Sequence, residues 1–127
     1  MLGEKDATAT IAVKDLKAAR RFYEDQLGLK PTREEMNGTI SYKTGGSSLL
    51  VYTSQFAGTN QATSATWSVG KDFDDILKSL QSKGVTFEHY DNLPSLARQG
   101  DAYQSADGYK LAWFKDPDGN IHHLISI

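Results

Sequence analysis

The chain has 127 residues, of which 24% are charged and 39% hydrophobic, and its formal net charge is −2. This balance is ordinary for one globular domain with its own core, and it argues against disorder. There is no cysteine, which excludes disulfides, thiolate catalysis and cysteine-ligated zinc. There is also no basic run, no apolar stretch of about 18 residues and no signal-peptide core, so we expect a cytoplasmic protein that binds neither nucleic acid nor membrane.

The first part of the chain predicts a strand, a helix and a hairpin, in that order. Residues 7–13 alternate and end in β-branched side chains, which favours a strand. Asp15 can cap the helix that follows, apolar side chains recur after it at helical spacing, and Gly28 is typical of a helix C-terminus. Residues 39–44 and 48–53 are strand-like and flank two glycines, so we expect them to pair as a hairpin.

The same pattern begins again after a polar stretch, residues 54–63, which we interpret as a linker. Residues 64–69 alternate as a strand, and residues 73–83 carry the apolar spacing of a helix. Residues 85–90 predict another strand. Residues 91–108 have no clear pattern, and connections of that length are usually functional or disordered. This last stretch is either a lid over a pocket, with Arg98 as its only guanidinium, or a solvated loop with some strand at Tyr103.

The C-terminal residues 109–127 predict a second hairpin. Its turn is the Asp-Pro-Asp-Gly segment at 116–119, where proline fixes φ and glycine tolerates a positive φ. His122 and His123 follow this turn directly. Adjacent side chains in a strand point to opposite faces, so at most one of these histidines can face a given pocket.

These elements form an internal repeat of about 56 residues, in which a strand, a helix and three strands occur twice. Module one spans about 7–53 and module two about 64–127. One such unit is too small to bury both faces of its sheet, whereas two units side by side share a core and leave a cup between them. The matching positions are Val13 with Val69, Gly28 with Gly84, and Gly46 with Gly119.

Three segments resemble signatures of the vicinal oxygen chelate superfamily, which includes glyoxalase I, bleomycin-resistance proteins, fosfomycin-resistance enzymes and extradiol dioxygenases. The segments are residues 13–16, residues 21–23 taken with residues 27–29, and residues 112–120 (Ala-Trp-Phe-Lys-Asp-Pro-Asp-Gly-Asn). The resemblance covers essentially the whole chain. It implies one α+β domain, residues 1–127, built from paired βαβββ modules that form a U-shaped mixed sheet with helices on its outer face. It also implies a homodimer.

The same resemblance implies where metal ligands would lie in this chain. The first-strand positions are Thr8 and Ser64, and the last-strand positions are Leu50 and His123. A catalytic divalent metal needs about three nitrogen, oxygen or thiolate ligands from the protein. Three of these four residues are unsuitable, so we expect no metal at this site and no cofactor.

His123 is the candidate catalytic residue, because a histidine titrates near neutrality and this one should face the cup. The alternative is a histidine in the pocket wall, bonded to a strand neighbour. We expect His122 to be structural and His89 to lie on the surface. Glu88, His89 and one of the paired histidines have suitable side chains for a different metal site, but no recognised ligand spacing joins them.

Alternation along the four strands nearest the module interface predicts the residues that line the cup. Tyr52 could offer a ring face and a hydroxyl there, or could simply pack in the sheet. Trp67 should lie on the helix side, whereas Trp113 and Phe114 point to opposite faces and the sequence does not say which one lines the cup. The predicted ligand-binding set is Thr8, Thr10, Leu50, Tyr52, Ser64, Thr66, His123 and Ile125.

Two classes of function therefore remain open. The first is a protein that binds a small, partly apolar organic molecule in the cup without a metal, as bleomycin-resistance proteins do. The second is an enzyme of the lyase, isomerase or dioxygenase type that uses His123 as an acid or base, or an atypical metal set. The missing ligands favour binding.

Overall fold

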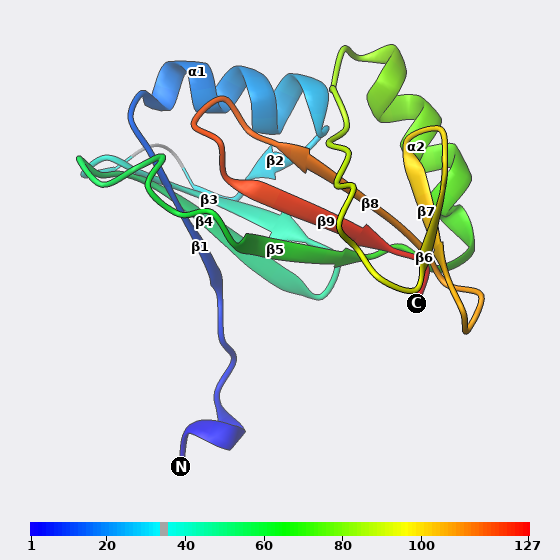
Figure 1. Cartoon of the computed structure of the whole chain (residues 1–127). Coiled ribbons are helices and arrows are strands. Elements are labelled where there is room, and N and C mark those ends of the chain that lie inside the picture. Colours follow the sequence, from blue (N-terminus) through cyan, green and yellow to red (C-terminus); the bar gives the residue numbers. More distant parts are fainter. Residues whose placement is uncertain (34–35) are drawn as a thin grey trace.

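The computed structural model describes residues 1–33 and 36–127. The chain forms two successive runs of elements after a 3₁₀ turn at Leu2–Glu4 (Figure 1). The first run consists of strand β1 (Ala9–Val13), helix α1 (Leu16–Arg20) continued by a π-helical turn (Arg21–Gln26), and strands β2 (Lys30–Pro31), β3 (Thr39–Thr44) and β4 (Ser47–Thr53). The second run consists of β5 (Thr63–Ser68), a 3₁₀ turn (Gly70–Asp72), α2 (Phe73–Ser82), β6 (Leu96–Gln99), β7 (Ala102–Ser105), β8 (Lys110–Lys115) and β9 (Ile121–Ile125).

The strands form two mixed sheets with a common plan. The four-stranded sheet has the order β1-β4-β3-β2, and the five-stranded sheet has the order β5-β9-β8-β7-β6. In each sheet the first strand runs parallel to the last one, and the other neighbours are antiparallel. The two sheets meet where β1 lies beside β5 (Figure 1). The predicted α+β fold is thereby confirmed.

The core lies on the helix side of both sheets. At the end of β1 and in the middle of β4 buried residues (Ile11 and Val13, Leu49 and Val51) alternate with more exposed ones, which is the pattern of strands with one covered face. The helical segments contribute the opposing apolar residues, and one contiguous cluster joins both halves. Its largest members include Phe22, Tyr23, Tyr42, Phe73 and Phe114.

Local sequence determines where the first helix begins and ends. The Asp15 carboxylate accepts a hydrogen bond from the backbone amide of Lys17, as predicted for an N-cap. Gly28 has a φ of +75°, which a side-chain-bearing residue adopts only with strain. The chain therefore turns there and enters β2.

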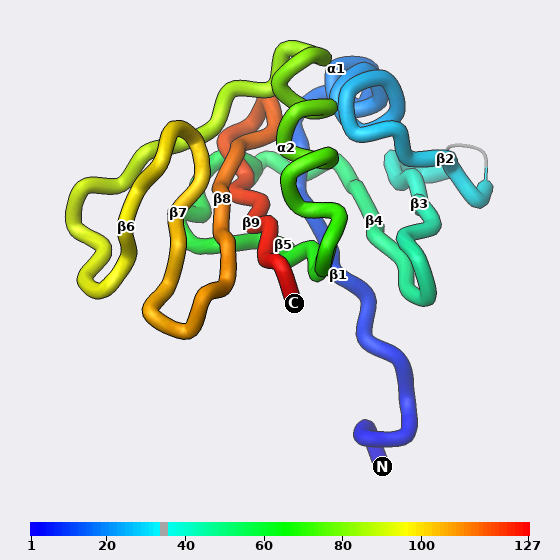
Figure 2. The backbone as a smooth tube through the Cα atoms, turned by 90° about the vertical axis from the view of Figure 1, so that its right-hand side faces the viewer, coloured from blue at the N-terminus to red at the C-terminus, as the bar shows by residue number. Residues whose placement is uncertain are grey.

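Two expectations for the second half are corrected. Residues 85–90 were expected to form a strand, but they contribute only an isolated bridge between Phe87 and Phe114. Beside this bridge the backbone N–H of Glu88 donates to the Trp113 carbonyl (2.7 Å), and at Tyr90 the Tyr103 hydroxyl accepts from the backbone N–H (2.6 Å) and donates to the carbonyl (3.2 Å). Residues 91–108 contain the strand expected at Tyr103, which is β7, but they are more ordered than a solvated loop: β7 pairs with β6 in a hairpin whose outer strand forms the far edge of the sheet (Figure 2).

The N-terminal strand is also shorter than predicted. It begins at Ala9 rather than at residue 7, and residues 1–8 are exposed and extend away from the sheets (Figures 1 and 2). Thr8 therefore lies before β1 and outside the ladder.

Candidate functional site

The two adjacent histidines of β9 lie on opposite faces of the five-stranded sheet. His122 is fully buried on the helix side, and His123 is half-buried on the open side. In β4, Leu49 and Val51 are likewise buried while Tyr52 is not. The face assignment that the alternation predicts is therefore correct.

His122 belongs to a buried chain of hydrogen bonds. Trp67 Nε1 donates to His122 Nδ1 (3.0 Å). Since an indole N–H can only donate, Nδ1 is unprotonated and the proton of the neutral ring is on Nε2. His122 Nε2 then donates to the Tyr23 hydroxyl (3.0 Å), and that hydroxyl donates to Asp116 Oδ2 (2.8 Å). Asn120 Nδ2 completes the chain with a bond to the same carboxylate oxygen (2.8 Å).

Burial and nearby charge hold the titratable groups of this hydrogen-bond chain in one protonation state. Burial lowers the pKa of His122 to about 4, and the nearby Asp116 carboxylate only partly opposes that shift. Burial, followed by the charge of Asp116, raises the pKa of Tyr23 well above its usual range. His122 is therefore neutral and fully bonded at physiological pH, which supports the structural role expected from the sequence.

On the open face, three side chains form a row across neighbouring strands. The pairing register places Thr66 opposite His123, and His123 opposite Trp113. The Thr66 hydroxyl lies 3.5 Å from His123 Nδ1. The rings of His123 and Trp113 are stacked, with centroids 4.9 Å apart and planes at 15°. Trp113, rather than Phe114, is therefore the aromatic residue that β8 contributes to this face.

Tyr90 extends the row beyond Trp113. Its ring meets the Trp113 ring edge-on at 5.7 Å, and Tyr103 contacts the same indole edge-on at 5.4 Å. The Tyr103 hydroxyl also fixes the Tyr90 backbone through the two bonds described above. We define the open-face row as Thr66, His123, Trp113 and Tyr90.

Two polar atoms of this row are enclosed and have no hydrogen-bond partner among residues 1–33 and 36–127: His123 Nε2 and the Tyr90 hydroxyl. Burial lowers the pKa of His123, so its ring is neutral at pH 7. Burial and then the charge of Glu88 raise the pKa of Tyr90, which keeps its hydroxyl protonated. The row thus offers a neutral imidazole and a phenol, and buried polar groups of this kind are normally satisfied.

The structure distributes the eight predicted cup residues over a wider surface than expected. Thr10 pairs with Leu50, and Tyr52 lies between Ala12 and Thr39 in the other sheet. A depression of about 540 Å³ beside the β3–β4 turn includes only Thr66 of the eight. The eight residues therefore do not line this depression together, and their role in binding stays a prediction.

The structure shows where three of the eight predicted cup residues lie. Ser64 lies in a bulge of β5 and accepts a hydrogen bond from Asn60 Nδ2 (3.2 Å). Ile125 faces the open side opposite Leu111 in β8. Thr8 is exposed before the first strand.

Sequence reasoning missed Tyr90 and left Trp113 undecided. The signal for Trp113 is present in the hairpin itself, because counting outwards from the Asp-Pro-Asp-Gly turn pairs it with His123. No comparable signal exists for Tyr90, since its place depends on the hydroxyl of Tyr103 thirteen residues later.

The surface histidine lies apart from the row. His89 is exposed and pairs with Asp101 at 2.7 Å, with the Arg98 guanidinium 3.4 Å from its other nitrogen. Arg98 also donates to the carbonyl of Gly100 (3.0 Å).

The side chains at the implied metal positions do not suit a divalent cation. Thr8 and Ser64 are neutral hydroxyls, Leu50 has no donor atom, and His123 is a single imidazole. Across residues 1–33 and 36–127, no group of three or more histidines and carboxylates is placed to hold a metal ion. In the same part of the chain, no helix is long and apolar enough to cross a membrane.

Comparison with known proteins gives a consistent result. The structure superposes on the glyoxalase family protein from Enterococcus faecalis with a TM-score of 0.72 at 20% identity, covering 98% of this chain and 99% of that one. The glyoxalase/bleomycin resistance protein/dioxygenase from Alicyclobacillus acidocaldarius matches with a TM-score of 0.70 at 21% identity, covering 95% and 89%. The lactoylglutathione lyase from Agrobacterium tumefaciens matches with a TM-score of 0.70 at 16% identity, covering 95% and 92%. At these identities the likeness concerns the fold.

No curated protein matches the sequence. The family model of the Glyoxalase/Bleomycin resistance protein/Dioxygenase superfamily matches residues 7–124. With its two sheets of common plan and this match over nearly the whole chain, the protein belongs to the Glyoxalase/Bleomycin resistance protein/Dioxygenase superfamily.

Proposed function

We propose that the open-face row binds a small, partly apolar organic molecule. The observation that carries this proposal is the pair of enclosed, unpartnered polar atoms, His123 Nε2 and the Tyr90 hydroxyl, which belong to two rings that both contact Trp113. A buried polar atom without a partner costs about 1–3 kcal/mol. Both atoms are enclosed, so a ligand would reach them only after neighbouring side chains move; one that then supplies both partners would recover this free energy.

The chemistry of the row indicates the kind of molecule it would accept. Trp113 gives an apolar aromatic wall, and the polar contacts come from a neutral imidazole, a phenol and the Thr66 hydroxyl. Such a site favours a neutral molecule with one or two hydrogen-bonding groups. It would bind a phosphate poorly, because phosphates require guanidinium or ammonium partners.

A second candidate function is catalysis by the same residues. The lowered pKa of His123 leaves its ring in the basic form at neutral pH, and its Nε2 is the atom without a partner. A neutral imidazole with a free nitrogen is suited to accept a proton from a bound substrate. His123 would then act as the general base of a lyase or isomerase reaction.

A thermal-shift screen of small neutral compounds against the purified protein tests the binding proposal. A compound that raises Tm in the wild type should lose its effect in His123→Ala and in Tyr90→Phe. His89→Ala, which changes an exposed histidine outside the row, should keep the effect. Tyr52→Ala reports whether the ligand also reaches the first sheet. A ligand whose shift survives both row variants would contradict the proposal.

Metal analysis separates binding from the atypical-metal form of the enzyme hypothesis. We expect no stoichiometric transition metal in the purified protein, and no change of Tm with chelator. One tightly held zinc, nickel or iron ion per chain would refute this expectation.

Two further properties remain proposals based on the family. We expect a homodimer in solution, and light scattering that gives the 14.0 kDa of one chain would contradict it. We also expect the protein to be cytoplasmic, which fractionation of the source cells would test.

A further inference from the structure

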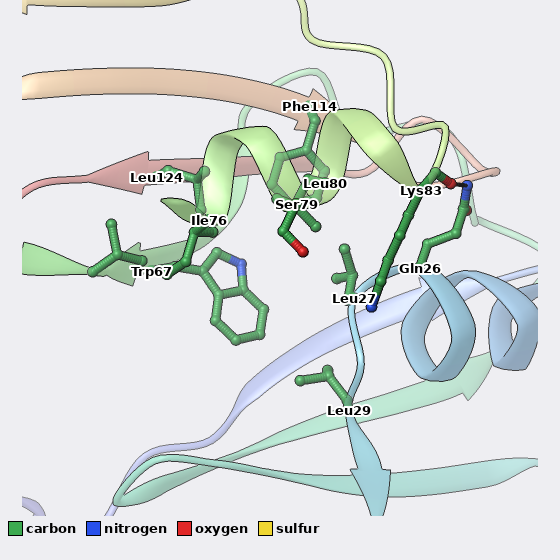
Figure 3. Close-up of a pocket in the computed structure, with 11 residues that line it drawn as sticks. Gln26, Leu27, Leu29, Trp67, Ile76, Ser79, Leu80, Lys83, Phe114 and Leu124 are labelled. Atoms are coloured by element: carbon green, nitrogen blue, oxygen red, sulfur yellow. Dashed lines mark hydrogen bonds between the residues drawn. The ribbon is translucent and has the colours of Figure 1, made fainter. Parts of the chain in front are cut away.

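A second cavity lies between the two halves of the chain, on the helix side of the five-stranded sheet. Its volume is about 230 Å³. Leu27 and Leu29 form the wall from the first half, and Trp67, Ile76, Phe114 and Leu124 are among the residues from the second half (Figure 3). The open-face row lies on the opposite side of the sheet, so this cavity is a separate feature and does not depend on the proposed function.

The cavity is apolar along most of its length and polar at one end. Eight of its eleven lining residues are apolar. Figure 3 shows Gln26 and Lys83 together at one end, with Trp67 and Ile76 towards the other. Gln26 Nε2 donates to the Lys83 carbonyl (3.0 Å), which ties the two halves together at the polar end.

The ammonium group of Lys83 is the charged group at this end. Its side chain extends along the cavity mouth towards Leu27 (Figure 3). Among residues 1–33 and 36–127, none forms an ion pair or a hydrogen bond with this ammonium. Ser79, one turn earlier on α2, directs its hydroxyl towards the same space (Figure 3).

We propose that this inter-module cavity binds a small amphipathic monocarboxylate, with its hydrocarbon chain against Trp67 and Ile76 and its carboxylate at Lys83. A volume of about 230 Å³ accommodates a short hydrocarbon chain against the apolar wall, while the head group stays at Lys83, which is exposed. The single cation at the rim selects an anionic head group, and charge-assisted hydrogen bonds are the stronger kind. The ligand would contact both halves and stabilise their association.

The protein contains two tryptophans, and they report on different sites. Trp67 lines the cavity, whereas Trp113 lies in the open-face row. In Trp113→Phe the fluorescence therefore comes from Trp67 alone. Titration of this variant with sodium octanoate should give a saturable change, and octanoate should also raise the Tm of the wild type.

Matched variants test the two halves of the proposal. Lys83→Met should weaken octanoate binding about tenfold and leave the binding of 1-octanol within about twofold, because only the acid carries the charge that Lys83 recognises. Lys78→Met removes an exposed lysine of α2, the helix that ends just before Lys83, and this lysine lies outside the cavity lining, so the variant should change neither affinity. Ile76→Phe fills the apolar end and should abolish both, while urea unfolding shows whether this variant stays folded.

Three results would overturn the proposal. The first is a Trp67 signal that does not change up to about 10 mM octanoate. The second is an equal loss of octanoate and octanol affinity in Lys83→Met. The third is a Trp67 signal that changes with protein concentration but not with octanoate, which would show that a second copy of the chain fills the cavity. The result of the open-face screen is independent of all three.

Discussion

The two histidines on opposite faces of β9 have the same side chain but opposite hydrogen-bonding environments. On the helix side, both nitrogens of His122 are bonded, and its neighbours Trp67 and Tyr23 are bonded in turn. On the open side, His123 has one long contact to Thr66 and one nitrogen without a partner among the described residues. A complete set of bonds favours a structural role, whereas an incomplete set leaves binding capacity for another molecule. Four pairs of variants test this difference.

Alanine substitution of each histidine should give the largest contrast. His122→Ala leaves Trp67 Nε1 without an acceptor, removes a partner of Tyr23 and opens a cavity. We expect it to lower the free energy of unfolding by about 3–5 kcal/mol. His123→Ala should cost about 1 kcal/mol, because its side chain is half-buried and poorly bonded. Urea unfolding followed by circular dichroism measures both, and equal costs would show that the two faces do not differ.

Acid pH should destabilise the protein mainly through the helix side. In the native state the pKa of His122 is about 4, whereas an unfolded histidine titrates near 6.5. Between these values the unfolded state binds more protons, so stability falls as the pH falls. At about 1.4 kcal/mol per pKa unit, the loss between pH 7 and pH 4 is about 3 kcal/mol.

The matched variants identify the source of this pH dependence. His122→Asn should lose most of the slope between pH 6.5 and 4, and His123→Asn should keep most of it. The pKa of His123 is also lowered by burial, so its contribution has the same sign. A slope that persists in His122→Asn would assign the effect to other groups.

Apolar truncations extend the comparison beyond the histidines. Leu80 of α2 is buried in the core, and Ile125 of β9 is half-buried on the open face. We expect Leu80→Ala to cost about 2–3 kcal/mol, near the low end for buried leucines because it borders the cavity, and Ile125→Ala about 1 kcal/mol. Thermal and urea unfolding should agree on this order. A larger cost at Ile125 would mean that the open face is covered in solution.

Removing one hydroxyl from each side should give the smallest effects. Tyr23→Phe deprives Asp116 and His122 of a bonding partner, and we expect a loss of about 1–3 kcal/mol. Tyr90→Phe removes an enclosed hydroxyl with no partner among the described residues, so it should not destabilise the protein and should raise the free energy of unfolding by up to about 1–3 kcal/mol. The same Tyr90→Phe variant should nevertheless lose ligand binding. A clear destabilisation by Tyr90→Phe would indicate a water-mediated bond.

The sequence predicted the parts of the fold that depend on local pattern. Alternation in β4 and β9 was enough to place Tyr52 and His123 on the face away from the helices. Capping chemistry located the start of α1 at Asp15, and Gly28 marks the end of the π-helical turn that continues it. In each case the signal is contained in a few consecutive residues.

The sequence did not predict features that depend on distant partners. Residues 85–90 have strand-like composition, but they form a single bridge, and both backbone groups of Tyr90 are bonded to the distant Tyr103 hydroxyl instead of to a strand. The hairpin β6–β7 lacks alternation because it lies at the sheet edge, where much of each strand is exposed. The cavity beside Trp67 requires Leu27 and Leu29 from the other half of the chain, so no local pattern could reveal it.

The buried hydrogen-bond chain around His122 has a consequence for the lifetime of the folded state. Its bonds join residues that are 55, 93 and 99 positions apart, and they draw on both halves of the chain. Contacts of such long separation require much loop closure, so we expect them to form after the folding transition state. Interactions absent from the transition state slow unfolding and leave the folding rate nearly unchanged. These few polar atoms would therefore determine how long a folded molecule survives before it opens, more than how fast it folds.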